Sequence, residues 1–104
     1  AYNVEFVRDA STGKLSAYIL DGHAENFVRI KAVSFEATAT INGEKRPLKF
    51  QAVPNAATGE TVGDTSQFDT AADWLKAPGT FTVTIPTLEI RGSAFKSISA
   101  TLKP

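Results

Sequence analysis

Residues 33–52 read VSFEATATINGEKRPLKFQA, and this stretch decides the fold class of the chain. Over 33–41 an apolar or small side chain stands at every odd position and a polar one at every even position. That spacing places the apolar side chains on one face of a β-strand, and no helix face would collect them. Asn42-Gly43 then supplies the two positive φ angles of a type I′ turn, and Leu48, Phe50 and Ala52 restore the alternation. The stretch predicts a β-hairpin.

The residues before this hairpin predict two further strands. Alternation over 2–7 predicts a strand with one buried face, and the turn-forming cluster at 9–14 predicts that the chain reverses there. Residues 15–20 are apolar on both faces, which is typical of a central strand. The polar segment 21–26 reads as a turn, after which Phe27, Val28 and Ile30 resume the apolar pattern and Val33 opens the hairpin with its side chain inward.

The second half of the hairpin and the segment after it carry breakers and turn formers. Pro47 has no N–H to donate, so the beginning of its strand is expected at a sheet edge. Residues 54–67 are small, polar and without periodicity, which predicts a long exposed loop and makes it a second candidate site. Phe68 predicts a short strand. Thr70 and Asp73 have capping-box spacing, so residues 70–76 predict one helical turn from which Trp74 plugs an end of the core.

The last quarter of the chain alternates again, with one slip. Apolar residues at 81, 83 and 85 have the opposite parity to those at 88 and 90, so a bulge or bend is expected near Pro86. Arg91-Gly92 predicts a turn and residues 98–102 a final strand. Phe95 lies out of phase with that strand, which predicts that it covers the outer face.

Together these segments predict an all-β protein. About seven strands with one short helical turn near 70–76 are typical of an antiparallel β-sandwich of the immunoglobulin or fibronectin-III kind. The spacing contains no βαβ unit, internal repeat or linker, so residues 1–104 are expected to form a single domain.

Composition excludes several classes of function. The 104 residues include 11 basic and 11 acidic side chains in scattered positions, so no electrostatic field favours nucleic acid as a partner. No apolar run approaches the roughly 20 residues that cross a bilayer, so no membrane insertion is expected. Absence of cysteine excludes disulfides and thiolate metal sites. The chain has no methionine and begins inside an expected strand, which favours loss of a leader such as a secretory signal.

The turn 21–26 is the first candidate site. Asp21, His23 and Glu25 stand two residues apart, so in an extended turn one imidazole and two carboxylates would face a divalent metal ion. The competing interpretation is that Asp21 and Asn26 form turn hydrogen bonds and His23, the only histidine, is exposed. No nucleophile with a partnered base is recognisable, so the sequence predicts that the protein is not an enzyme.

Three segments also carry a family resemblance. VEFVRDASTGKLSAYILDGHAENFVRI (4–30), INGEKRPLKFQAV (41–53) and ATGETVGDTSQF (57–68) are similar to a family of small bacterial periplasmic or secreted proteins. In that family a histidine-rich leader and a His-Gly-Gly element precede this domain, and the genes often lie beside heavy-metal efflux systems. The resemblance covers nearly the whole chain, and the segment from Tyr18 to Glu25 is its most specific part.

The resemblance implies a periplasmic β-sandwich that holds or hands over cations such as copper, zinc or cobalt. It implies that upstream histidines are the main ligands. The hypothesis for this chain is that His23 anchors the site, with Asp21 and Glu25 supplying charge. The first hypothesis is therefore a non-enzymatic, extracytoplasmic binding or accessory domain in metal-cation homeostasis, partnered by a protein of an efflux system. The second is a structural or interaction module that docks through a strand edge or the 54–67 loop. The sequence predicts no oligomeric state.

Overall fold

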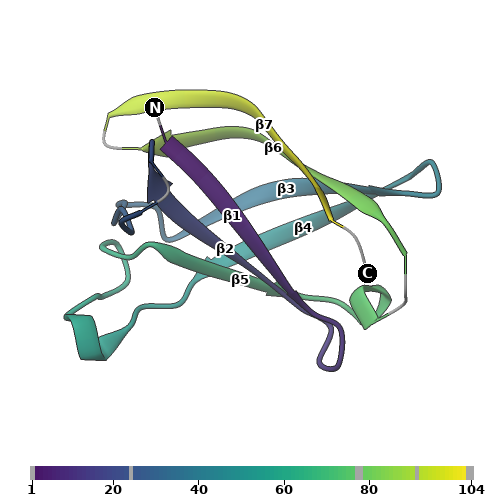
Figure 1. The fold of residues 1–104 in the computed structure, drawn as a ribbon, viewed down its shortest axis with the longest axis horizontal. Helices are drawn as coiled ribbons and strands as arrows, with labels where there is room; N and C mark the ends of the chain where they lie inside the picture. Colours follow the sequence, from purple (N-terminus) through teal and green to yellow (C-terminus); the bar gives the residue numbers. More distant parts are fainter. Residues whose placement is uncertain (1, 24, 77–78, 91, 103–104) are drawn as a thin grey trace.

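The computed structural model describes residues 2–23, 25–76, 79–90 and 92–102, and its secondary structure is almost entirely antiparallel β (Figure 1). Its strands are β1 (Tyr2–Asp9), β2 (Lys14–Asp21), β3 (Ser34–Ile41), β4 (Glu44–Ala52), β5 (Gln67–Ala71), β6 (Phe81–Ile90) and β7 (Ser93–Leu102). Two short 3₁₀ turns, η1 (Ala56–Thr58) and η2 (Asp73–Lys76), flank β5. The all-β class and the hairpins that the alternation predicts are confirmed.

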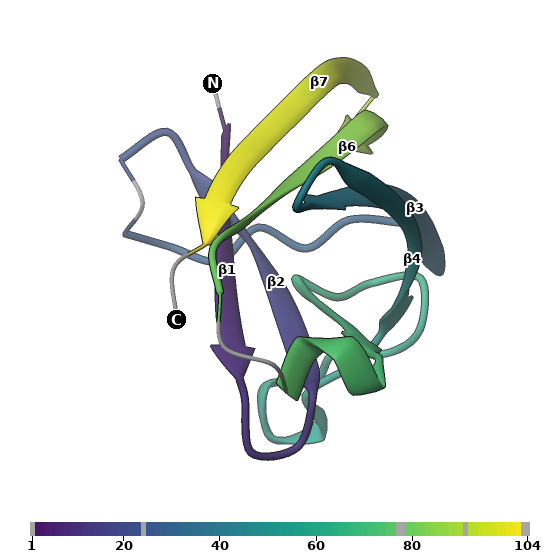
Figure 2. The same ribbon diagram turned by 90° about the vertical axis from the view of Figure 1, so that its right-hand side faces the viewer.

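The strands form one sheet in the order β1-β2-β5-β4-β3-β6-β7. Figure 2 shows that this sheet curls until β7 lies beside β1. The expected division into the two sheets of an immunoglobulin-like sandwich is not confirmed. A curled sheet encloses an apolar interior just as two stacked sheets do, so the alternation along each strand is the same in both arrangements.

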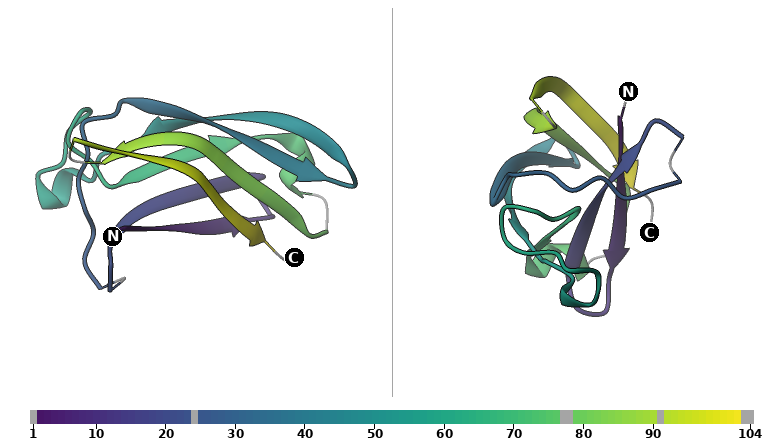
Figure 3. Two further views of the ribbon diagram at one scale, coloured as in Figure 1. Left: turned by 90° about the horizontal axis from the view of Figure 1, so that it is seen from above. Right: turned by 90° about the vertical axis from the view of Figure 1, so that its left-hand side faces the viewer.

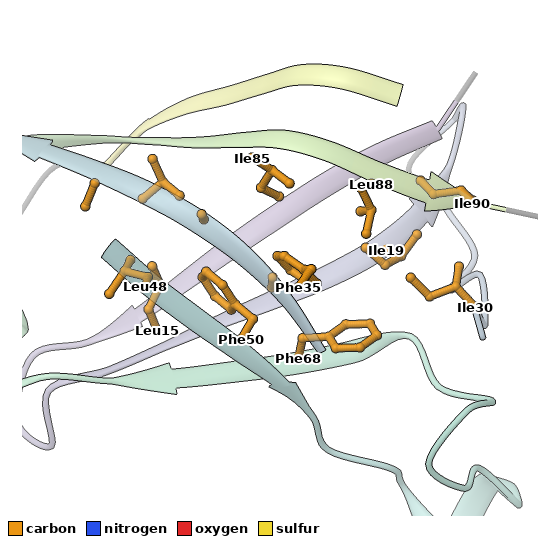
Figure 4. Close-up of a cluster of buried hydrophobic side chains, with 14 of the residues drawn as sticks. Leu15, Ile19, Ile30, Phe35, Leu48, Phe50, Phe68, Ile85, Leu88 and Ile90 are labelled. Atoms are coloured by element: carbon orange, nitrogen blue, oxygen red, sulfur yellow. The ribbon is translucent and has the colours of Figure 1, made fainter. Parts of the chain in front are cut away.

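The interior of the curl is filled by large apolar side chains (Figure 4). Phe50 and Phe68 are fully buried, and Phe35 stacks on Phe50 with 4.9 Å between ring centroids and meets Phe68 edge-on at 5.1 Å. Residue types predicted to face inward on β3, β4 and β6 therefore meet in one cluster. Val33 is an exception, because it lies just before β3 and is 58% exposed.

The hairpin of β3 and β4 matches its prediction closely. Ile41 is paired with Glu44 across Asn42-Gly43, whose φ angles are 52° and 79°. Pro47 lies in the part of β4 that pairs only with β3, since β5 pairs with Gln51 and Ala52 alone. Its missing N–H thus costs no ladder bond, which confirms the expected local edge.

Near Pro86 the apolar side chains of β6 and β7 change from one residue parity to the other, although the pairing register of the two strands stays the same. Ile85 is opposite Ile98 and Leu88 is opposite Phe95, so the same pairing continues on both sides of Pro86. No extra residue is inserted, and the parity slip is a bend shared by both strands. Phe95 consequently faces the interior with Leu88, and the expectation that it covers the outer face is wrong.

The helical turn starts later than the capping-box spacing predicts. Thr70 is not a cap, because it lies in β5 opposite Leu15, and η2 begins at Asp73. Leu75, which is fully buried, plugs this end of the core, while Trp74 is half-buried and meets Phe81 edge-on at 5.5 Å.

Candidate functional sites

The turn 21–26 is organised by the carboxylate of Asp21. Its Oδ1 accepts hydrogen bonds from the N–H groups of His23 at 3.2 Å and Glu25 at 3.0 Å. Its Oδ2 accepts from the side-chain amide of Asn26 at 3.0 Å. These bonds, led by the one from Glu25 and followed by that from Asn26, hold the pKa of Asp21 below its usual value. The turn-forming role inferred for Asp21 and Asn26 is confirmed.

The same geometry bears on the predicted metal ligands. Both oxygens of Asp21 already serve the turn, while His23 and Glu25 are exposed. Within the described residues no group of three or more His, Asp or Glu side chains is placed to hold a metal ion. The structure thus brings the backbone, and not the side chains, of His23 and Glu25 to Asp21, and the metal site stays a prediction.

The segment 54–66 has more structure than its sequence indicates. The side chain of Glu60 is only 8% exposed, although it lies in a segment expected to be an open loop. The carboxylate accepts hydrogen bonds from the Thr65 hydroxyl at 2.6 Å, the Ser66 hydroxyl at 3.0 Å and the Asn55 N–H at 3.1 Å. Burial raises the pKa of Glu60, but these bonds and the nearby charge of Arg29 outweigh it and leave the pKa below its ordinary value.

Arg29 ties this loop to the segment that follows the 21–26 turn. Its guanidinium donates to the carboxylate of Asp64 at 3.2 Å and to the carbonyl of Thr58. Beside this junction lies an open pocket of about 970 Å³, lined by Arg29, Ile30, Lys31, Ala32, Gly63, Asp64, Glu89 and Gly92. The sequence had no signal for this pocket, because its walls come from two loops and the β6-β7 hairpin, which meet only in the folded chain.

Exposed apolar side chains occur in the same loops. Phe27 is 64% exposed and Val62 is 61% exposed, and each lies within two residues of a pocket residue. Phe27 contacts Tyr18, with 5.8 Å between ring centroids. Their exposure could not be read from the sequence, since apolar residues after a turn also open buried strands.

The two edges of the sheet form a further candidate site. In Figure 3 the C-terminal end of β7 lies close to β1, and the two strands diverge toward the start of β7. We call the region where the outer edges of β1 and β7 meet the seam. Tyr2 and Phe95 meet edge-on across it, with 5.6 Å between ring centroids. Among the described pairings, β1 pairs only with β2 and β7 only with β6.

Burial is weakest along this seam. No residue of β1 or β7 is among the buried hydrophobic residues that the structure describes. The side chains that face inward from the two edge strands are all half-buried: Tyr2, Val4, Phe6 and Arg8 in β1, and Phe95, Ile98, Ala100 and Leu102 in β7. The core is therefore well covered by the five inner strands and thinly covered where the edges meet.

Comparison of the chain with protein-family models, with curated proteins and with solved structures found no match. The family resemblance therefore stays a prediction that rests on the quoted residues. None of the helices in the described ranges is long and apolar enough to cross a bilayer.

Proposed function

We propose that the chain is a non-enzymatic interaction domain that binds an extended segment of another protein at the free edges of its sheet. One observation carries the proposal: the inward faces of β1 and β7 are half-buried, and neither edge has a described strand partner. Unpaired strand edges offer rows of N–H and C=O groups, and such edges commonly recruit extended peptides.

Hydrogen exchange tests this proposal directly. A binding partner that adds a strand should slow exchange at alternate amides of β1, of β7 or of both, because only every second N–H of an edge strand points outward. Protection confined to the 54–66 loop, with both edge strands unchanged, would show that docking uses the loop instead.

A metal-homeostasis role in the periplasm is the second proposal. It is supported by the exposure of His23 on a turn that Asp21 holds in place, which leaves the imidazole accessible to an ion whose other ligands come from elsewhere. Titration with Zn²⁺ and Cu²⁺ should then give binding that His23→Ala weakens, both in this chain and in a form to which a histidine-rich leader of the kind that the resemblance implies has been added. Unchanged binding in the extended His23→Ala variant would refute the anchoring role.

A further inference from the structure

The strand order fixes how the two edges are oriented. Every described pairing in the sheet is antiparallel, so direction alternates from β1 through β7. With seven strands in the sheet, the first and last run the same way, as Figure 1 shows. The edges therefore cannot form an antiparallel pair with each other, whereas a strand placed between them would be antiparallel to both.

The hydrogen bonds of β2 show which groups of β1 are free. Ile19 is opposite Val4, yet its N–H donates to Ser66 O at 2.9 Å and its carbonyl accepts from Val28 N at 2.8 Å. Ile19 thus faces away from β1, and by the alternation of antiparallel ladders the N–H and C=O of Val4 and Phe6 point to the seam. An incoming residue bonded to Val4 would place its side chain on the core side, because directly opposed residues share a face.

Arg8 of β1 bridges one end of the seam, where its guanidinium donates to the carbonyls of Leu75 and Gly79. It also lies over the Phe81 ring at 5.1 Å, and the described contacts along the rest of the seam are few. The Tyr2 and Phe95 rings touch, and no backbone hydrogen bond joins β1 to β7. An inserted strand would separate the edges to roughly 9–10 Å, twice the spacing of neighbouring strands. The inserted strand would separate the rings of Tyr2 and Phe95 and would form a backbone hydrogen-bond ladder with each edge strand.

Charge on the outer face indicates the chemistry of the inserted strand. Glu5 and Asp9 point outward from β1 and are exposed, and neither forms an ion pair within the part of the chain that is described. Oδ1 of Asp9 accepts hydrogen bonds from the N–H and the hydroxyl of Ser11, so Glu5 is the less engaged of the two carboxylates. Outward side chains of an added strand would lie beside them, where opposite charges on neighbouring strands attract and like charges repel. Lysine, arginine and threonine are favoured beside Glu5 and Asp9, and threonine is favoured beside the exposed Lys96 of β7, with apolar residues inward.

We infer that the seam between β1 and β7 accepts one extended segment of a partner protein, antiparallel to both edges, in which apolar residues alternate with basic or hydroxyl residues. The inference rests on the proposed edge binding and adds its location, direction and side-chain pattern. The inserted segment completes a closed sheet of eight strands, and its apolar residues cover the half-buried faces of Val4, Phe6 and Ile98.

The test uses a capped heptapeptide in which valine alternates with lysine and threonine, added to the full chain labelled for NMR. A spin label at the peptide N-terminus should broaden amides near Arg8 and Leu102, and a label at its C-terminus should broaden those near Tyr2 and Phe95. A peptide with glutamate in place of lysine should bind more weakly because of Glu5 and Asp9. Reversed broadening, or equal binding of the two peptides, would overturn the inference.

Two variants at one position separate backbone from side-chain effects. Val4→Pro removes a seam-facing N–H without breaking a bond to β2 and should weaken binding about tenfold, the effect of roughly 1.4 kcal/mol. Val4→Ala keeps the N–H and should weaken it less. Equal loss in both variants would contradict backbone pairing.

Three other outcomes are informative. Broadening along β1 alone or β7 alone would keep the proposed edge binding but refute insertion between the edges. Binding of the lysine-containing peptide elsewhere on the chain, or no binding of it at all, would refute both the edge binding and the insertion. Concentration-dependent dimerisation that protects the same amides would show that a second copy of the chain, and not a partner peptide, occupies the seam.

Discussion

Asp21 illustrates how a single carboxylate holds a turn. Its folded pKa lies below the ordinary 3.8, so its stabilising bonds are complete above that pH and are lost as the pH falls through the lower folded value. We expect the amide NMR signals of His23 and Glu25 to shift together in that acidic range. Asp21→Ala should abolish the transition, and Asp21→Asn should keep the turn at neutral pH. Amide signals of His23 and Glu25 that do not shift in that acidic range would contradict this role.

Glu60 is the residue whose loss should affect the 54–66 loop most. Glu60→Ala leaves the Asn55 N–H and the hydroxyls of Thr65 and Ser66 without their acceptor, at a cost of about 3 kcal/mol in the free energy of unfolding. Glu60→Gln keeps an acceptor and should cost about half as much. Urea unfolding measures both. An alanine variant as stable as the glutamine variant would show that the buried network does not hold the loop.

Sequence reasoning reached the role of Asp21 but not that of Glu60. Asp21 bonds to residues within five positions, and such local bonding is a known habit of aspartate in turns. Glu60 also bonds locally, but its burial depends on Arg29 and on the position of Ser66, whose carbonyl accepts a hydrogen bond from Ile19 of β2. A polar, glycine-containing segment gives no sign that one of its carboxylates is enclosed.

At the level of elements, the β1-β2 turn should be less tolerant of substitution than the β3-β4 turn. Gly13 and Gly43 have φ angles of 70° and 79°, so alanine is strained at both, by about 1 kcal/mol. A Cβ on Gly13 would also lie 2.7 Å from the carbonyl oxygen of Ala72, whereas Gly43 has open space around it. Gly13→Ala should therefore lower the unfolding free energy by at least about 1 kcal/mol more than Gly43→Ala. Equal losses would show that the contact relaxes freely.

Elements whose signals are local were predicted well, and those set by a neighbour were not. Asn42-Gly43 and the alternation around it specify their hairpin without help from the rest of the chain. Thr70 instead pairs with Leu15, a contact 55 positions away in sequence, and this overrides the capping-box spacing. Phe95 was misplaced because its face depends on the bend that β7 shares with β6.

For the whole molecule, the sequence specified an apolar interior but not the closure of the sheet. Alternation states that Phe6 and Phe50 face inward, and both do. Whether the strands that carry them belong to one sheet or two depends on which edges pair, and edge pairing leaves no periodic signal. The sequence likewise carried no sign of the seam, because inward residues alternate with polar ones in the same way whether they are half-buried or fully buried.

The uneven cover of the core predicts unequal effects of equivalent substitutions. Phe50 is fully buried among inner strands, whereas Phe6, whose ring lies 6.0 Å from that of Phe50, is half-buried at the seam. Phe50→Ala should cost about 4 kcal/mol and Phe6→Ala about half of that, because solvent already reaches the seam and the remaining cavity is open. Chemical unfolding measures both values. Equal costs would mean that the edges close as tightly as the inner strands, which would remove the basis for strand insertion there.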